Sequence, residues 1–182
     1  MESKTILFHS NEENLCDAFL SGKESLLLSG NSNDDKWLGQ GMYFWDNRGN
    51  ANWWNNKQAK RHPEKKYKIV KINACTDDLL DLTDYDVYIK TKALWERYCK
   101  LTETDPNVPL GNKLNTMYSA FSDWNIMYKV IKIFGKYNRT PSRGIFTFDY
   151  NSMDAEPTMA VKCIYSIKDG SCITEKEIIK EE

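Results

Sequence analysis

Short apolar strands are predicted near both ends of the chain, and this arrangement most constrains the fold. Residues 5–9 form a compact apolar run that ends in a polar residue, and residues 67–73 alternate between polar and apolar side chains. Both patterns are typical of strands. Further extended segments are predicted at residues 79–83, 145–148 and 160–167. A largely helical stretch at about residues 84–136, broken near residues 106–111, lies between the early and late strands. The chain is therefore expected to be α+β, with a helical insertion in its middle.

Length and composition favour one globular domain. The chain has 182 residues, of which 41% are hydrophobic and 28% are charged. A chain of this length can bury a substantial core as a single domain. We find no internal repeat, low-complexity tract or linker in the sequence, so residues 1–182 are predicted to form a single domain.

The charge balance gives no overall preference for nucleic acid. The chain has 25 basic and 26 acidic residues and a formal net charge of -1, so no global field attracts a polyanion. One local basic segment remains a candidate for nucleic-acid contact, although a solvated helix end and loop explain it equally well. Its members are Lys57, Lys60, Arg61, Lys65, Lys66 and Lys68.

The cysteines and the N-terminus indicate a cytoplasmic protein without a metal. The five cysteines are irregularly spaced, and the chain has only two histidines. Neither a disulfide framework nor a structural zinc site is expected from such a pattern. The first residues lead into an apolar strand, not a signal peptide, and no apolar run approaches the roughly 20 residues of a membrane span. We therefore expect no membrane partner.

Two separated segments contain the candidate functional residues. His9 and Ser10 follow the first strand, whereas Gly39 and Gly41 precede an aromatic strand that contains Tyr43. Glycines in such a turn permit positive φ or close approach to a ligand. Taken singly, a histidine after a strand is more often a core residue, and a Gly-x-Gly sequence is commonly only a turn. A helix is expected next, with Asp46 or Asn47 as its cap and with Ala51, Trp54 and Gln58 along one side.

Together these segments resemble the ADP-ribosyltransferase superfamily of the His-Tyr-Glu type, which includes the poly(ADP-ribose) polymerases and diphtheria toxin. Residues 6–10 (Ile-Leu-Phe-His-Ser) resemble the family's strand ending in His-Gly, and residues 39–44 resemble its Gly-Lys-Gly-Ile-Tyr-Phe turn. Residues 50–52 (Asn-Ala-Asn) stand where the polymerases have Ser-Ala-Asn. Residues 36–45 are more similar still to a group of uncharacterised bacterial proteins with Asp-Trp-Leu-Gly-x-Gly-Ile-Tyr-Phe-Trp.

The resemblance implies a split β-sandwich core that binds NAD as a substrate. It implies that His9 donates a hydrogen bond to a ribose hydroxyl, that the Ser10 amide binds the carboxamide, and that Tyr43 stacks under nicotinamide. The side chains of His9 and Tyr43 are then expected to face each other across one cleft. Gly41 and Asn50 are expected to lie at the cofactor. Either Arg143 or Lys162 could face the pyrophosphate, although Arg143 could equally form a surface ion pair.

The family's glutamate is missing from its expected strand. Its place falls at Ile164 or Lys162, and residues 160–167 contain no acid. The preceding loop offers Glu156 and Asp154, and Pro157 could fix the backbone beside Glu156. We therefore name His9, Tyr43 and Glu156 as the candidate catalytic residues, while an ordinary loop acid remains the alternative for Glu156.

The resemblance implies a mono-ADP-ribosyltransferase that uses NAD to modify a protein or a nucleic acid, as a bacterial or phage toxin or defence effector would. Three alternatives stay open. One is a catalytically silent module that binds NAD or a related ligand, another is an NAD glycohydrolase, and the third is 2′-phosphotransfer on RNA.

Overall fold

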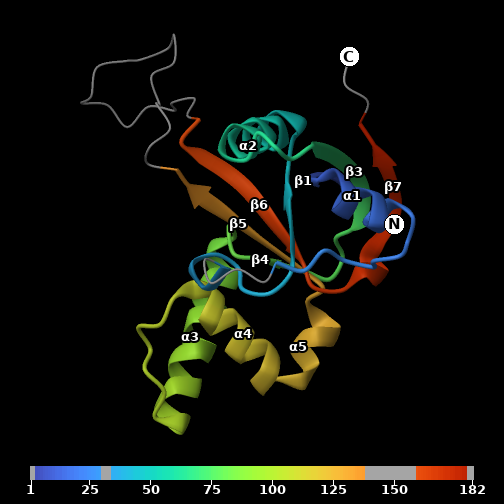
Figure 1. Ribbon diagram of the computed structural model, residues 1–182. Helices are drawn as coiled ribbons and strands as arrows, with labels where there is room; N and C mark the ends of the chain where they lie inside the picture. Colours follow the sequence, from blue (N-terminus) through green and yellow to red (C-terminus); the bar gives the residue numbers. More distant parts are fainter. Residues whose placement is uncertain (1–2, 30–33, 138–158, 180–182) are drawn as a thin grey trace, which may run out of the picture.

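The computed structural model describes residues 3–29, 34–137 and 159–179. Their strands form one seven-stranded sheet in the order β4-β5-β6-β2-β1-β3-β7 (Figure 1). β4 and β5 are parallel, and every other neighbouring pair is antiparallel. The strands are β1 (Lys4–Glu12), β2 (Met42–Trp45), β3 (Tyr67–Cys75), β4 (Leu79–Asp81), β5 (Val130–Lys136), β6 (Val161–Ile167) and β7 (Ile173–Ile178). The α+β class predicted from the sequence is confirmed.

The helices lie at opposite ends of the sheet. Figure 1 shows α3, α4 and α5 gathered below the sheet, while α1 and α2 lie towards its other end. The helices are α1 (Glu13–Leu20), α2 (Arg48–Arg61), α3 (Tyr85–Thr102), α4 (Leu110–Ala120) and α5 (Ser122–Met127), with 3₁₀ turns η1 (Asp34–Lys36) and η2 (Gly170–Cys172). None of the described helices is long and apolar enough to cross a membrane.

The join between β1 and β2 is the narrowest in the sheet. Phe8 and Trp45 are the single pair of Cα partners there, whereas β1 and β3 pair from Lys4 to Glu12. Two core clusters cover the two faces. One contains Leu7, Phe19, Met42, Phe44 and Val70 and packs against α1, and the other contains Trp45, Ala51, Trp95, Leu114 and Trp124 and packs against α2 to α5.

Two parts of the predicted secondary structure are wrong. The helical insertion ends before Val130, since Val130–Lys136 is strand β5, which pairs with β4 and β6. Its β-branched residues Val130 and Ile131 are fully buried inside the sheet. Strand β7 is absent from the predicted segments, and it pairs with β3 along one edge of the sheet. The predicted strand at residues 145–148 lies outside the described residues.

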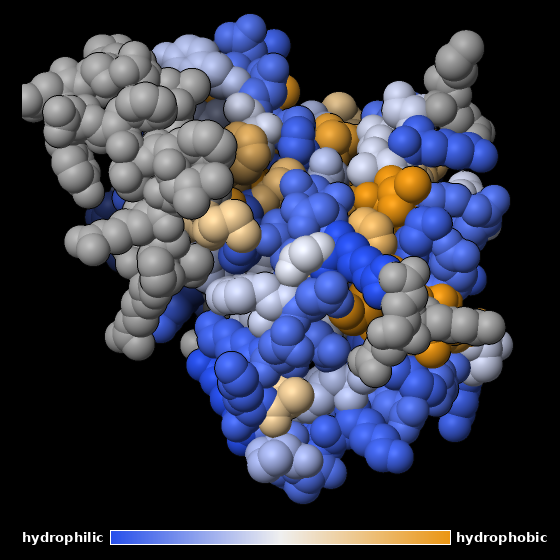
Figure 2. Space-filling model, turned by 90° about the horizontal axis from the view of Figure 1, so that it is seen from above, coloured by the Kyte–Doolittle hydropathy of each residue, from blue (hydrophilic) through white to orange (hydrophobic). Residues whose placement is uncertain are grey.

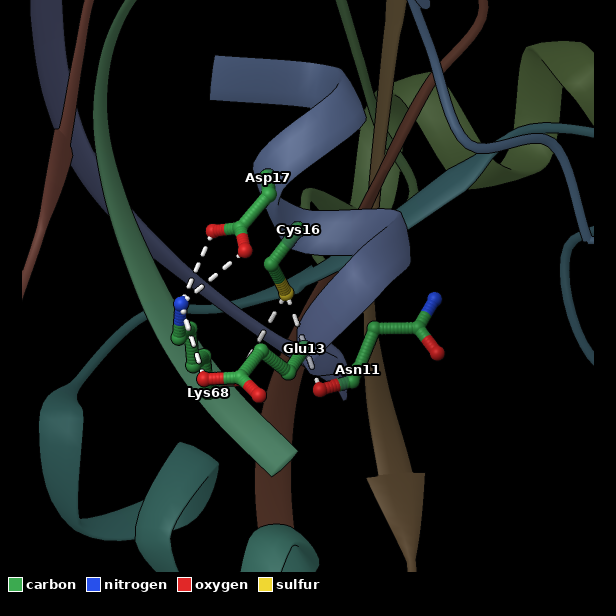
Figure 3. A network of polar contacts seen from close by, with 5 residues as sticks. All are labelled: Asn11, Glu13, Cys16, Asp17 and Lys68. Carbon is green, nitrogen blue, oxygen red and sulfur yellow. Dashed lines mark hydrogen bonds and ion pairs between the residues drawn. The ribbon is translucent and has the colours of Figure 1, made fainter. Parts of the chain in front are cut away.

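A polar network fixes α1 against β3 (Figure 3). The Lys68 ammonium lies 2.9 Å from the carboxylate of Asp17 and 3.0 Å from that of Glu13. The Cys16 thiol is buried beside them and points at the backbone carbonyls of Asn11 and Lys68. Burial raises the pKa of Cys16 to about 11, so this thiol is a packing group. The network thereby positions the end of β1 that follows His9.

Candidate functional site

A cleft of about 1080 Å³ opens beside the narrow join between β1 and β2. β1 contributes His9 to Glu12, β2 contributes Tyr43 to Trp45, and α2 contributes Trp54, Lys57, Gln58 and Arg61. Residues 26–29 and the side chains of Trp37, Tyr67 and Tyr137 complete much of the wall. Aromatic rings thus supply a large part of the lining, which suits a flat ligand.

His9 bridges β1 and β2 where their pairing stops. Its Nδ1 atom lies 2.6 Å from the backbone oxygen of Tyr43, and its ring packs on Phe44 with a centroid separation of 5.4 Å. Since a carbonyl can only accept, Nδ1 must carry the proton that is donated. The opposite nitrogen, Nε2, is buried and has no hydrogen-bond partner among the described residues.

The environment keeps His9 neutral. Only 8% of its surface is exposed. Burial lowers the pKa of His9 from 6.5 to about 4, although its hydrogen bond to Tyr43 acts in the opposite direction. With Nδ1 protonated in a neutral ring, Nε2 is an acceptor. A ribose hydroxyl would therefore have to donate to His9, which reverses the direction that the family resemblance implies.

Tyr43 uses its hydroxyl to close the turn before β2. The phenol donates to the backbone oxygen of Gly39 at 2.6 Å and accepts from the backbone nitrogen of Leu38 at 3.0 Å. Gly39 has φ +69°, the left-handed conformation that glycine adopts most easily. The hydroxyl of Tyr43 is therefore occupied by the turn, and its ring remains as the part that a ligand could contact.

The side chains of His9 and Tyr43 lie on opposite faces of the sheet. Phe8 pairs directly with Trp45, so Tyr43, two residues from Trp45, shares the face of Phe8. His9, next to Phe8, points to the other face and contacts Phe44. The expectation that the two side chains face each other is wrong. Both still line one cleft, because the cleft lies at the join between their strands.

The other predicted ligand contacts divide into two groups. Ser10 lines the cleft, and its hydroxyl donates to the side-chain oxygen of Asn55 on α2 at 3.1 Å. Gly41 is not among the residues that line the cleft. A Cβ atom at Gly41 would collide with the hydroxyl of Ser166 and would lie 3.1 Å from the backbone oxygen of Ile167. Glycine is therefore required at position 41 because β6 packs closely against it, and not because a ligand lies there.

Asn50 holds a buried lysine. Asn47 caps α2 by accepting from the backbone nitrogen of Asn50 at 2.8 Å. The Asn50 amide nitrogen donates to Asp46 at 3.1 Å, and its oxygen accepts from the ammonium of Lys162 at 2.9 Å. The Asn50 side chain is thereby committed to protein partners and does not line the cleft.

Lys162 occupies one of the two places on β6 where the resemblance locates the glutamate. It is 2% exposed, and its ammonium lies 4.8 Å from the ring centroid of Trp53 and 5.9 Å from that of Tyr137. Burial lowers the pKa of Lys162, whereas the negative charge of Asp46 acts to raise it. Among the described residues no carboxylate lies within ion-pair distance of this ammonium.

Two predicted site residues, Arg143 and Glu156, lie outside the described residues. Sequence reasoning had not assigned a ligand role to Trp54 or Gln58, which line the cleft from one side of α2. Their spacing along the predicted helix was the available signal.

Within the described part of the chain, no group of three or more histidine, cysteine, aspartate or glutamate residues could hold a metal ion.

No family model, curated protein or solved structure matches the chain.

Proposed function

We propose that the chain binds NAD in the cleft between β1, β2 and α2 and transfers its ADP-ribose group to a protein or nucleic-acid acceptor. The resemblance of residues 6–10 and 36–45 to ADP-ribosyltransferases suggests this activity. The β1–β2 join, reduced to one residue pair, fits the split sheet of that fold. The observation that carries the proposal is His9, a buried neutral imidazole in the wall of an aromatic cleft, whose Nε2 has no partner among the described residues.

An unpaired buried acceptor costs free energy, so a ligand hydroxyl that donates to it removes this cost. The two riboses of NAD provide such hydroxyls, and its two flat rings suit the aromatic lining. In this mode His9 positions the ribose, and Ser10, next to it on β1, lies within the same cleft. Holding the sugar in one orientation favours cleavage of the glycosidic bond, since an oriented substrate has less entropy to lose.

The second candidate is a catalytically silent NAD-binding module, and Lys162 is the observation that favours it. Cleavage of the nicotinamide bond develops positive charge at the anomeric carbon, which calls for a nearby negative charge. Lys162 brings a buried ammonium to β6 and no acid is present on that strand. Transfer therefore requires a carboxylate from elsewhere, and Glu156 is our candidate.

Two measurements on the full chain test the proposal. Calorimetric titration with NAD should show binding, and His9→Asn should weaken it about tenfold, the effect of one lost hydrogen bond. Lys90→Gln, an exposed position on α3 that does not line the cleft, should leave the affinity unchanged. Failure of the wild-type chain to bind NAD would refute both candidates.

The second measurement follows nicotinamide release and the transfer of radiolabel from NAD to macromolecules. Release that needs added cell lysate indicates a transferase, release without lysate indicates a glycohydrolase, and binding without release indicates the silent module. Glu156→Gln should lower turnover far more than NAD affinity. If Glu156→Gln and Asp154→Asn both keep full turnover, the loop acids are not the source of the negative charge.

A further inference from the structure

Basic residues outnumber acidic ones in α2 and in the segment that follows it. Residues 48–68 contain seven basic residues and one acidic residue, whereas the whole chain has a net charge of -1. The rest of the chain is therefore strongly acidic in balance. α2 itself has four basic residues and no acid. This segregation creates a local positive field that the net charge conceals.

Part of this charge is neutralised, and part of it is not. Lys68 is paired with Asp17 and Glu13, as Figure 3 shows, and Lys65 is paired with Glu12 at 2.5 Å. By contrast, no described carboxylate forms an ion pair with Lys60, Arg61 or Lys66. These three side chains are exposed. With Lys57, they are called the basic rim below.

The basic rim continues directly into the candidate cleft. Trp54, Lys57 and Arg61 line it together, because residues three or four positions apart share one side of a helix. The Lys57 ammonium lies 4.9 Å from the ring centroid of Trp53 and 5.4 Å from that of Trp54. Figure 2 shows the molecule from the side on which α2 lies in Figure 1. The surface there is mostly hydrophilic and contains small hydrophobic patches.

We propose that the basic rim binds single-stranded nucleic acid, which would be the acceptor in the transfer reaction; that last role rests on the proposed function. Cations along a groove attract the phosphates of a strand, and aromatic rings beside them stack on its bases. Stacking on an aromatic ring beside the rim needs an unpaired base, which excludes a duplex. An acidic peptide would pair with the cations, but it has no flat aromatic groups that could stack on the rings of the cleft.

The direct test is the fluorescence anisotropy of a labelled single-stranded oligonucleotide of about 12 residues, titrated with the full chain without NAD. Binding should weaken steeply as salt rises from about 50 to 200 mM. The double variant Lys60→Gln/Arg61→Gln should bind about tenfold more weakly at the lower salt and should show a shallower salt dependence. Lys90→Gln/Lys100→Gln, an equal charge change at exposed positions on α3, should bind as the wild type does. DNA and RNA versions of the strand identify the preferred sugar.

Three results would overturn the inference. They are the absence of salt-dependent binding, an equal loss of affinity in the α3 variant, and binding of a polyglutamate peptide or a duplex as tight as that of the single strand. NAD calorimetry on the same preparation separates this inference from the proposed function. If the chain binds NAD but does not bind the oligonucleotide, only the nucleic-acid role of the basic rim is refuted. If the chain binds the oligonucleotide but does not bind NAD, the proposed function is refuted and the nucleic-acid role of the basic rim stands.

Discussion

The buried neutral state of His9 predicts a specific dependence of stability on pH. The pKa of His9 is about 4 in the folded chain, against 6.5 for an ordinary histidine. Between these values the unfolded chain binds a proton at His9 that the folded chain does not. The stability that comes from a neutral His9 is therefore fully present above about pH 6.5 and is lost progressively as the pH falls towards about 4.

The size of this effect follows from the two pKa values. At pH 7 nearly all of the stabilisation remains, because an unfolded histidine is then mostly neutral. At about pH 5 protonation of His9 favours the unfolded state. The free energy of unfolding is therefore about 2 kcal/mol lower at pH 5 than at pH 7 because of His9 alone. Such a change is a large fraction of the stability of a typical domain.

The experiment compares urea unfolding of the wild type and His9→Asn at about pH 5 and 7. His9→Asn removes the titrating ring and keeps an N–H donor for the backbone oxygen of Tyr43. His9→Asn should lose about 2 kcal/mol less stability than the wild type between the two pH values, since all other titrating groups are common to the two proteins.

An equal pH loss in His9→Asn and the wild type would refute the buried neutral state. Should the variant not fold, NMR titration of the wild-type imidazole gives the same answer. A His9 pKa near 6.5 would contradict the reasoning, and a value near 4 would support it.

Three further outcomes are expected. Gly39→Ala and Gly22→Ala both place alanine at positive φ, but only at Gly39 does the new Cβ meet protein, including the backbone oxygen of Gly111 at 2.7 Å. Thermal unfolding should therefore show Gly39→Ala to be less stable than Gly22→Ala by about 2 kcal/mol, and equal stability would contradict the packing argument. Trp54→Leu should lower NAD affinity at least about tenfold in calorimetry while circular dichroism stays unchanged, and an unaltered affinity would remove Trp54 from the ligand site. Cys16, whose pKa burial raises to about 11, should resist iodoacetamide at about pH 8 in the folded chain, and rapid alkylation would contradict its burial.

Local sequence pattern predicted the strands that bury a regular apolar face. β1, β3 and β6 match the predicted segments because alternation or a compact apolar run reports burial directly. β5 was missed because Ile126 and Val130 continue a helical spacing from α4. Pairing with β4 and β6, distant in sequence, decides its conformation, and local pattern contains no record of such pairing.

β7 was missed for a different reason. Half of its residues are charged, which suggests a solvated segment, but β3 offers an edge with unpaired backbone groups. Glu177 reaches Lys71 across the two strands, and Glu175 reaches Asn73. A charged strand at the edge of a sheet satisfies that edge and discourages further association. Charge in a sequence therefore indicates exposure here, not absence of structure.

The candidate site shows the same limit at the level of single side chains. The motifs correctly brought His9, Ser10 and Tyr43 to one cleft. They could not predict that His9 and Tyr43 point to opposite faces, because this depends on the register between β1 and β2, which rests on one residue pair. A shift of that register by one residue would reverse the face of every side chain on one strand.

The pairing of Asn50 with Lys162 bears most directly on the choice between a transferase and a binding module. A buried ammonium is costly unless its donors are satisfied, and the Asn50 oxygen satisfies one of them. Asn50 is itself oriented by Asp46, whose exposed carboxylate also favours the charged form of Lys162 without forming an ion pair with it. The lysine is thus held by dipoles and aromatic rings, not by a direct counter-charge among the described residues. Chemistry that develops positive charge near β6 would be opposed by such a group, whereas binding of an anionic ligand would not. The electrostatics of β6 therefore favour binding over cleavage, and a transferase would need a carboxylate from outside β6, for which we propose Glu156.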